Sequence, residues 1–213
     1  GSTLVLTGGI TSPTIVLNFA GDLTGSGTLA AAVALQLQGG GNVGTSGSLI
    51  NIDTPSLVLG KSGGNTFLSN AGAISLEGST GTGALQVTAA GDITQGGAAL
   101  TVGGTTTLNS GANAITLNDT GNDFTGAVSL NNSGANDVSI TDANALVLGA
   151  STIGRDLSVT AGGHITQTGA ITATGGTSTF AVTNAASDIL LGTQANDFGG
   201  TAPVFGGTAT NIR

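Results

Sequence analysis

The feature that most constrains this chain is a short apolar-x-apolar triplet that returns throughout the sequence, each time followed within a few residues by Gly, Asn, Asp or Ser. Apolar residues at every second position are typical of a β-strand with one buried face. Strands this short are not stable alone, so each needs many hydrogen-bonded neighbours. The triplets include Leu4–Leu6, Leu57–Leu59, Leu85–Val87, Ile115–Leu117, Val128–Leu130, Val138–Ile140, Leu146–Leu148 and Leu157–Val159.

Longer segments of the chain repeat as well. Residues 85–95 return as residues 157–167, a shift of 72, and residues 115–124 return as residues 189–198, a shift of 74. A weaker copy occupies residues 57–67. Within this large repeat the triplets return about every 18–22 residues, which is the length of one solenoid coil. The repeats therefore predict coils that each contain two or three short strands.

The composition narrows the fold further. Hydrophobic residues make up 38% of the chain but aromatic residues only 3%, and Trp, Tyr, Met and Cys are absent. Such a chain cannot fill a wide core, which favours a narrow one built in thin layers. The 39 glycines do not recur at every third position, so collagen is excluded, and a charged fraction of 7% is too low for a solvated disordered chain. We predict an all-β parallel β-solenoid of roughly ten coils, a rod about 50 Å long at about 4.8 Å per coil.

Three local expectations follow from the pattern. Thr28–Gln38 contains good helix formers, but Leu35–Leu37 repeats the strand triplet, so we favour a strand over a short helix. Gly and Asn at the corners are expected to adopt left-handed backbone conformations. The residues Phe67, Phe124 and Phe198 follow Asn-Thr or Asn-Asp at matching places. We expect these rings to stack inside the core or cap a corner, with an exposed contact as the alternative.

The charge limits the classes of partner. The formal net charge is −8, and the only bases are Lys61, Arg155 and Arg213. Nucleic-acid binding requires several cations against the phosphates, so we predict no nucleic-acid partner, and an anionic membrane surface is disfavoured for the same reason. No long apolar span appears, since the nearest candidate, Leu29–Leu37, is too short to cross a bilayer. We therefore predict no membrane insertion.

Enzymatic chemistry has few candidate residues. The single histidine, His164, stands where the matching repeat has Asp92, which indicates an exposed turn rather than a catalytic triad. A glycan-cleaving solenoid needs paired carboxylates, and for an anionic sugar a nearby base. Glu77 is the only glutamate, while Lys61 and Arg155 are far apart in sequence. We predict that the chain is not an enzyme and has no catalytic or cofactor-binding residue.

Metal binding is also weakly indicated. The Gly-Gly-x-Gly-x-Asp repeat of calcium-binding β-rolls does not occur. Asp119 with Asp123, or Asp137 with Asp142, are the pairs that remain as oxygen ligands for Ca²⁺. Asp119 is replaced by Thr193 in the matching repeat, which weakens the first pair. We predict solvated or turn-capping aspartates and no metal site.

Threonine is abundant, notably in Thr105–Thr107, Thr172–Thr174 and Thr208–Thr210. A flat rank of outward Thr-x-Thr pairs can bind ice, but it requires the motif in every coil. The spacing here is irregular, and Thr is also simply a favourable strand residue.

Four phrases resemble a specific class of protein: residues 102–108, 121–130, 141–149 and 157–167. They are similar to the β-strand repeats of very large bacterial exoproteins, the filamentous-haemagglutinin-like adhesins of the two-partner secretion class. The resemblance is clearest between residues 57 and 200. It implies a right-handed parallel β-helix that is exported to the bacterial cell surface or secreted, and a role in adhesion, aggregation or biofilm formation and hence virulence. It brings no catalytic residues with it.

We therefore expect a non-enzymatic rod segment of a bacterial adhesin. Its expected partner is a receptor or glycan on a host or neighbouring cell, or another copy of itself. The alternatives are a self-associating scaffold and a carbohydrate-active β-helix enzyme. We expect one solenoid unit over residues 1–213, with Gly1-Ser2 as a cloning remnant and imperfect large repeats at about 57–124 and 125–198.

Overall fold

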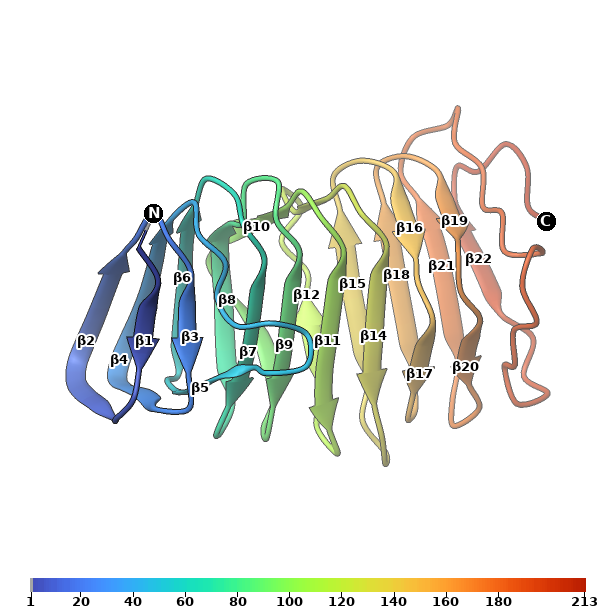
Figure 1. Cartoon of the computed structure of the whole chain (residues 1–213). Coiled ribbons are helices and arrows are strands. Elements are labelled where there is room, and N and C mark those ends of the chain that lie inside the picture. Colours follow the sequence, from blue (N-terminus) through green and yellow to red (C-terminus); the bar gives the residue numbers. More distant parts are fainter. Residues whose placement is uncertain (1) are drawn as a thin grey trace.

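The computed structural model describes residues 2–213 and shows a parallel β-solenoid, with no helix in that range (Figure 1). Gly1, half of the predicted cloning remnant, lies outside the described residues. Pairings between the named strands are parallel and join successive coils, so that Leu57 pairs with Leu76 and Ile115 pairs with Val138. The stack has about nine turns, so the predicted fold class is confirmed.

The strands form two broad faces, seen as a front and a back layer in Figure 1. The chain bends from face one to face two within β2 (Ile10–Asn18) and β4 (Thr28–Gly39). Face one also contains β1 (Leu4–Leu6), β3 (Leu23–Gly25), β5 (Ile50–Asp53), β7 (Thr66–Asn70), β9 (Leu85–Ala89), β11 (Thr106–Gly111), β14 (Val128–Asn132), β16 (Leu146–Leu148), β17 (Ser151–Ile153), β19 (Ile165–Gln167) and β20 (Ile171–Ala173). Face two also contains β6 (Ser56–Lys61), β8 (Ile74–Ser79), β10 (Ile93–Val102), β12 (Ile115–Leu117), β13 (Asp123–Phe124), β15 (Val138–Asp142), β18 (Leu157–Ala161), β21 (Ser178–Val182) and β22 (Val204–Gly207).

The core lies between the two faces as a narrow column of aliphatic side chains. Along β9, Leu85, Val87 and Ala89 are buried while the residues between them are less so. This alternation places one side chain of each pair inside and one outside. The predicted triplets are all strands, and Thr28–Gly39 is a strand rather than a helix.

The corners use glycine backbones and asparagine side chains in different ways. Within residues 2–213 every residue with a positive φ is a glycine, so the expectation that Asn adopts this conformation is wrong. At Gly78 (φ +99°) a Cβ would lie 2.0 Å from the Leu59 carbonyl oxygen of the previous coil, so no larger residue fits.

Asparagine instead joins one coil to the next through its side chain. Asp22 Oδ1 accepts the N–H of Asn42 at 2.8 Å, Asn42 Oδ1 accepts the N–H of Asn65 at 2.9 Å, and Asn65 Oδ1 accepts the N–H of Ala84 at 3.0 Å. These three bonds form a ladder, here called the Asp22 ladder, along one edge of the solenoid. It satisfies backbone donors that the turn leaves without a strand partner.

Matching parts of the large repeat lie on opposite faces. Residues 85–89 form β9 on face one, whereas the matching residues 157–161 form β18 on face two. Between them the chain crosses the solenoid an odd number of times, because the shift between the two copies equals about three and a half coils. The sequence repeat is therefore a repeat of seven strand passes, and successive copies are turned over relative to each other.

The three matching phenylalanines have three different environments. Phe124 is buried, as expected. Phe198 is partly buried against the core, with its ring centroid 6.0 Å from that of Phe180. Phe67 points outward on β7 and pairs across with Gln86, so the expected core position is wrong for this residue. In Asn-Asp-Phe124 the third residue faces inward, but in Asn-Thr-Phe67 the inward residue is Thr66.

Within residues 2–213 the structure contains no helix with the length and apolar character needed to cross a membrane.

Candidate functional site

His164 lies in an exposed turn, with a side-chain exposure of 52%. Its Nδ1 accepts the backbone N–H of Asp188 at 2.9 Å, one coil further on. Asp92, its counterpart in the earlier repeat, accepts the N–H of Ala114 at 2.9 Å in the same manner. The imidazole therefore replaces a carboxylate as a corner acceptor, in an exposed turn of the kind that the sequence comparison predicted.

Arg155 lies on an exposed corner beside two carboxylates from successive coils. It forms a two-point ion pair with Asp137, and its Nε is 3.8 Å from Asp156. The hydrogen bond from Arg155 lowers the pKa of Asp137 below its usual value. Asp137 Oδ1 also accepts the N–H of Asp156, and Asp156 Oδ1 accepts the N–H of Thr177. These carboxylates are bound to backbone donors and to Arg155, and Glu77 lies elsewhere, on β8.

Lys61 is buried at the end of β6, with 4% of its surface exposed, which the sequence did not indicate. Its Nζ donates to the Gly41 carbonyl and lies 5.0 Å from the centre of the Phe19 ring. Burial lowers the pKa of Lys61, while the nearby Asp22 carboxylate opposes this effect. Lys61 therefore closes a corner and does not belong to an exposed basic patch.

The structure does not bring either candidate calcium pair together as a ligand set. Asp119 caps the N–H of Gly121 at 2.8 Å, which closes a tight turn, and Asp123 faces outward on β13. Asp137 lies just before β15 and is partly exposed, whereas Asp142 is buried at the far end of that strand. Among the described residues no group of three His, Cys, Asp or Glu side chains is placed to hold a metal ion.

Asp142 stabilises a corner from inside the solenoid. Its Oδ1 accepts the N–H of Asn144 at 2.7 Å and its Oδ2 accepts the N–H of Phe124 at 3.0 Å. Burial raises the pKa of Asp142, against the effect of these two hydrogen bonds. The carboxylate is fully engaged and has a structural role.

Two reciprocal glutamine–asparagine bridges join successive coils, and sequence reasoning missed them. Asn122 Oδ1 accepts the N–H of Leu100 at 2.8 Å, and the amides of Asn122 and Gln95 bond to each other in both directions. Asn196 and Gln167 form the same reciprocal pair, and Asn196 Oδ1 accepts the N–H of Ile171 at 2.9 Å. The signal was present in the repeated Ile-Thr-Gln and Asn-Asp-Phe phrases.

The outward surface of face one presents a straight polar row. Its members pair from coil to coil across seven coils, and every one is Asn, Ser or Thr. The Asn51–Thr172 row consists of Asn51, Ser69, Thr88, Asn109, Asn131, Thr152 and Thr172. The row is mixed rather than a rank of threonines, and the middle residue of Thr105–Thr107 points into the core.

A groove of about 340 Å³, here called the loop groove, lies on face one beside the Asp22 ladder. One wall is the loop leading into β5, which crosses in front of β7 in Figure 1. A tight turn in which the backbones of Thr45 and Ser48 bond to each other closes this loop. The other groups at the groove are Asp22, Thr24, Asn42, Gly44, Asn65 and Phe67.

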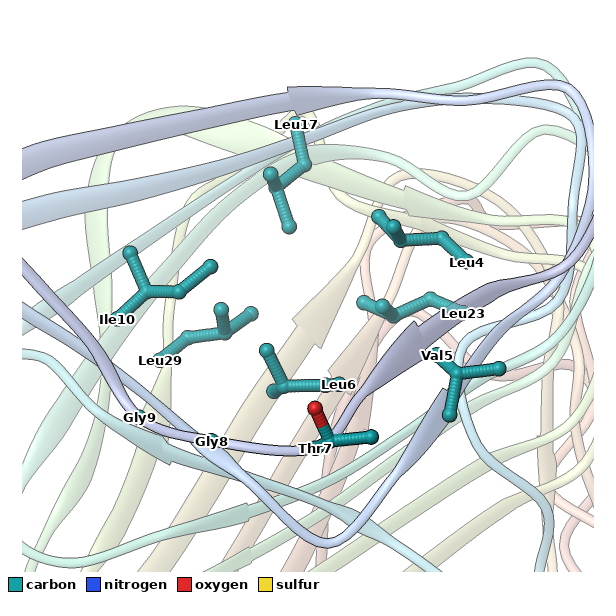
Figure 2. A pocket seen from close by; sticks show the side chains of 10 residues that line it. All are labelled: Leu4, Val5, Leu6, Thr7, Gly8, Gly9, Ile10, Leu17, Leu23 and Leu29. Carbon is teal, nitrogen blue, oxygen red and sulfur yellow. The ribbon is translucent and has the colours of Figure 1, made fainter.

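At its N-terminal end the core opens into an apolar cavity of about 310 Å³, shown in Figure 2. Leu23 and Leu29 are fully buried beneath it. Leu4, Val5 and Ile10 at its rim are between 43% and 56% exposed, which is high for aliphatic side chains of this size.

Comparisons with known proteins give one match. A family described as repeats of unknown function, DUF5649, matches residues 63–131 and again residues 135–204, which together make up about two thirds of the chain. Neither a search of curated proteins nor a search of solved structures gives a match. Each matched copy contains seven strand passes, and the two copies begin on opposite faces, at β7 and at β15. The chain therefore belongs to the DUF5649 repeat family.

Proposed function

We propose that this chain is a non-enzymatic rod segment of a secreted or surface-exposed bacterial adhesin, which holds and repeats weak binding surfaces along its length. The observation that supports this proposal is the Asn51–Thr172 row, an unbroken line of hydroxyl and amide groups across seven coils. Groups spaced at about 4.8 Å on a stiff support allow many weak contacts to act together.

The distribution of charge favours a neutral or polar partner. Of the three bases in the chain, Lys61 is buried and Arg155 is paired with Asp137. With a net charge of −8, the rod repels polyanions such as nucleic acids. The placement of the aspartates against backbone N–H groups supports a structural rather than a catalytic role for them.

The test is the binding of the fluorescently labelled chain to arrays of glycans and matrix proteins and to intact cells. We expect saturable binding that falls when outward residues of the row, such as Thr88 and Asn109, are changed together to Ala. Absence of binding to every surface would reduce the proposal to a spacer, and turnover of an arrayed glycan would overturn it in favour of a carbohydrate-active enzyme.

A second candidate is self-association of rods, favoured by the apolar cavity at the N-terminal end (Figure 2). Sedimentation velocity over a hundredfold range of concentration distinguishes this from receptor binding. Self-association predicts larger species that Ile10→Lys abolishes, whereas a monomeric rod at all concentrations excludes it.

A further inference from the structure

We propose that the loop groove binds a neutral carbohydrate, with Phe67 as the stacking platform and Asp22 and Asn65 as the groups that recognise hydroxyls. This inference deepens the proposed adhesive function and rests on it, because it assigns a ligand class to one place on the rod.

The groove is formed where one residue in a row of outward-facing positions, Gly44, has no side chain. Gly44 donates its N–H to the Leu23 carbonyl, and Phe67 donates its N–H to the Val43 carbonyl. Thr24, Gly44 and Phe67 therefore follow one another on three successive coils, about 4.8 Å apart. Because Gly44 has no side chain, a recess about two coils wide separates Thr24 from the Phe67 ring.

Glycine is required at this position. Gly44 has a φ of +64°, and a Cβ there would lie 2.8 Å from the Ser48 carbonyl oxygen and 2.9 Å from that of Phe67. The recess is thus fixed by backbone geometry rather than by a side chain that could move to fill it.

Free hydrogen-bonding groups face this recess. Asp22 uses Oδ1 to accept two bonds from Asn42, which leaves Oδ2 without a partner among the described residues. Asn65 uses Oδ1 for the Ala84 N–H, and its Nδ2 donates to no other described residue. One side of the recess thus offers a carboxylate acceptor and the other an amide donor.

These groups match the chemistry of a sugar. Adjacent hydroxyls both donate and accept, so a carboxylate and an amide can bind them together. The partly exposed, flat apolar face of Phe67 suits the C–H face of a pyranose ring. Among the residues that the structure describes along the groove, none is a base that could bind a sulfate or a carboxylate, and Lys61 turns its Nζ to the Gly41 carbonyl. A neutral glycan is therefore favoured over an anionic one.

A peptide strand fits this surface less well. Strand addition needs free backbone groups at a sheet edge, whereas β3 and β7 on either side of the groove are paired within the stack. The ligand must be recognised by side chains, as a sugar is.

The experiment is saturation-transfer NMR with cellohexaose, chitohexaose and mannohexaose as probes, and a heparin hexasaccharide as the anionic comparison. We expect at least one neutral probe to bind. Phe67→Ala should weaken the binding of that probe at least tenfold, because it removes the outward ring on which the sugar stacks. Asn65→Asp should do the same, because it keeps the acceptor for Ala84 but loses the amide donor. Thr107→Ala, in the same outward row two coils away, is the matched control and should leave binding unchanged.

Three results would overturn the inference: no neutral probe binds at millimolar concentration, only heparin binds, or Phe67→Ala and Thr107→Ala behave alike. Binding of the same variants to cells separates this inference from the adhesive proposal. If wild type and Phe67→Ala adhere equally, the groove assignment fails and adhesion stands. If wild type binds neither sugars nor cells, both fail.

Discussion

The two copies of the family repeat build the same bridge on opposite faces of the solenoid. In residues 63–131, Asn122 is fully buried and also donates to the Thr141 carbonyl of the next coil. In residues 135–204, Asn196 makes the same reciprocal bonds to Gln167 but is only partly buried, because the last coil covers it less completely. The repeat thus determines the bond pattern, whereas the neighbouring coils determine how much each bond contributes, as expected of a linear stack.

A charge placed in the core should give the largest difference between the two copies in the free energy of unfolding that is lost. Ile115 and Ile189 are matching residues, and both are fully buried. Ile115→Asp should cost more than about 4 kcal/mol, because an unpaired charge is buried between two sets of coils. Ile189→Asp should cost clearly less, since Ile189 lies near the end of the stack and is joined to the neighbouring coils by isolated bridges, to Ile165 and Ile212, rather than by a strand ladder. Urea unfolding followed by circular dichroism measures both.

Thr116→Asp is the control for this pair, because Thr116 is exposed on the same strand as Ile115. It should unfold like the wild type. Equal losses for Ile115→Asp and Ile189→Asp would show that the solenoid unfolds as a single unit rather than coil by coil.

Substitutions in the two glutamine–asparagine bridges should have the next largest effect on stability. Asn122→Ala should destabilise the fold by about 2–3 kcal/mol, since it leaves Gln95, the Leu100 N–H and two carbonyls without a partner. Asn196→Ala should cost about 1 kcal/mol, because water can reach the groups it exposes. A double-mutant cycle of Asn122→Ala with Gln95→Ala should show strong coupling. Independent, additive losses would mean that the two amides do not act as a pair.

The two copies should differ in how their stability depends on pH, because their matching corner residues are Asn70 and Asp142. Asn70 does not titrate, whereas burial raises the pKa of Asp142, so the folded state binds this proton more tightly than the unfolded chain does. The resulting stabilisation is complete below the unfolded pKa of about 3.9 and is lost as pH rises through the folded-state pKa. Relative to Asp142→Asn, wild type should therefore lose stability between about pH 4 and pH 7, by about 1.4 kcal/mol for each pH unit by which the pKa is raised.

Paired urea titrations at the two pH values test this, since the other acids are common to both proteins. Asp137→Asn should show the opposite sign in a lower pH range: because the hydrogen bond from Arg155 lowers the pKa of Asp137, wild type should lose stability relative to this variant as pH falls below about 3.9. A constant difference between wild type and Asp142→Asn across this range would contradict the raised pKa.

Removing one buried hydroxyl from each copy should stabilise the fold. Thr106 Oγ1 on face one and Ser178 Oγ, its counterpart on face two, have no hydrogen-bond partner among the described residues. Thr106→Val and Ser178→Ala should each stabilise the fold by about 1 kcal/mol, because they remove an unsatisfied polar group. Thr80→Val is the control: its buried hydroxyl donates to the Gly83 carbonyl at 2.8 Å, so its loss should destabilise. If Thr106→Val and Ser178→Ala destabilised the fold as Thr80→Val does, the hydroxyls of Thr106 and Ser178 would have hydrogen-bond partners after all.

The sequence predicted the strands and the solenoid because a period of two is visible in every triplet. It did not predict that matching segments lie on opposite faces, because this depends on coil length, which is not constant. The coil that joins the paired residues Ile50 and Leu68 is shorter than the coil that joins Thr179 and Val204. The Phe67 error has a related cause, since a shift of one residue along a strand moves a side chain from the core to the surface.

The polar sites were harder to predict than the strands. The bridging partners Gln95 and Asn122 are far apart in the chain, and only the recurrence of both phrases connects them. Lys61 stands among glycine and serine residues that suggest an exposed turn, yet the stacked coils bury it against Phe19. The loop groove depends on a missing side chain, at Gly44, which no sequence motif marks.

The smallest effect on stability is expected at the matching position of His164 and Asp92, although an imidazole and a carboxylate differ in chemistry. His164 and Asp92 both accept a backbone N–H from the next coil at 2.9 Å, and both do so at an exposed corner. His164→Asp should therefore change the free energy of unfolding by less than about 0.5 kcal/mol, because the carboxylate can make the same bond to the Asp188 N–H. The Asp188 carboxylate, 3.9 Å from His164 Nδ1, would repel the new charge, but it is partly exposed to water, which screens the repulsion. His164→Ala, which removes the acceptor, is the informative comparison and should be the less stable of the two in urea unfolding. If His164→Asp were instead the more damaging change, the imidazole would have a role at this corner that Asp92 does not have in the other copy.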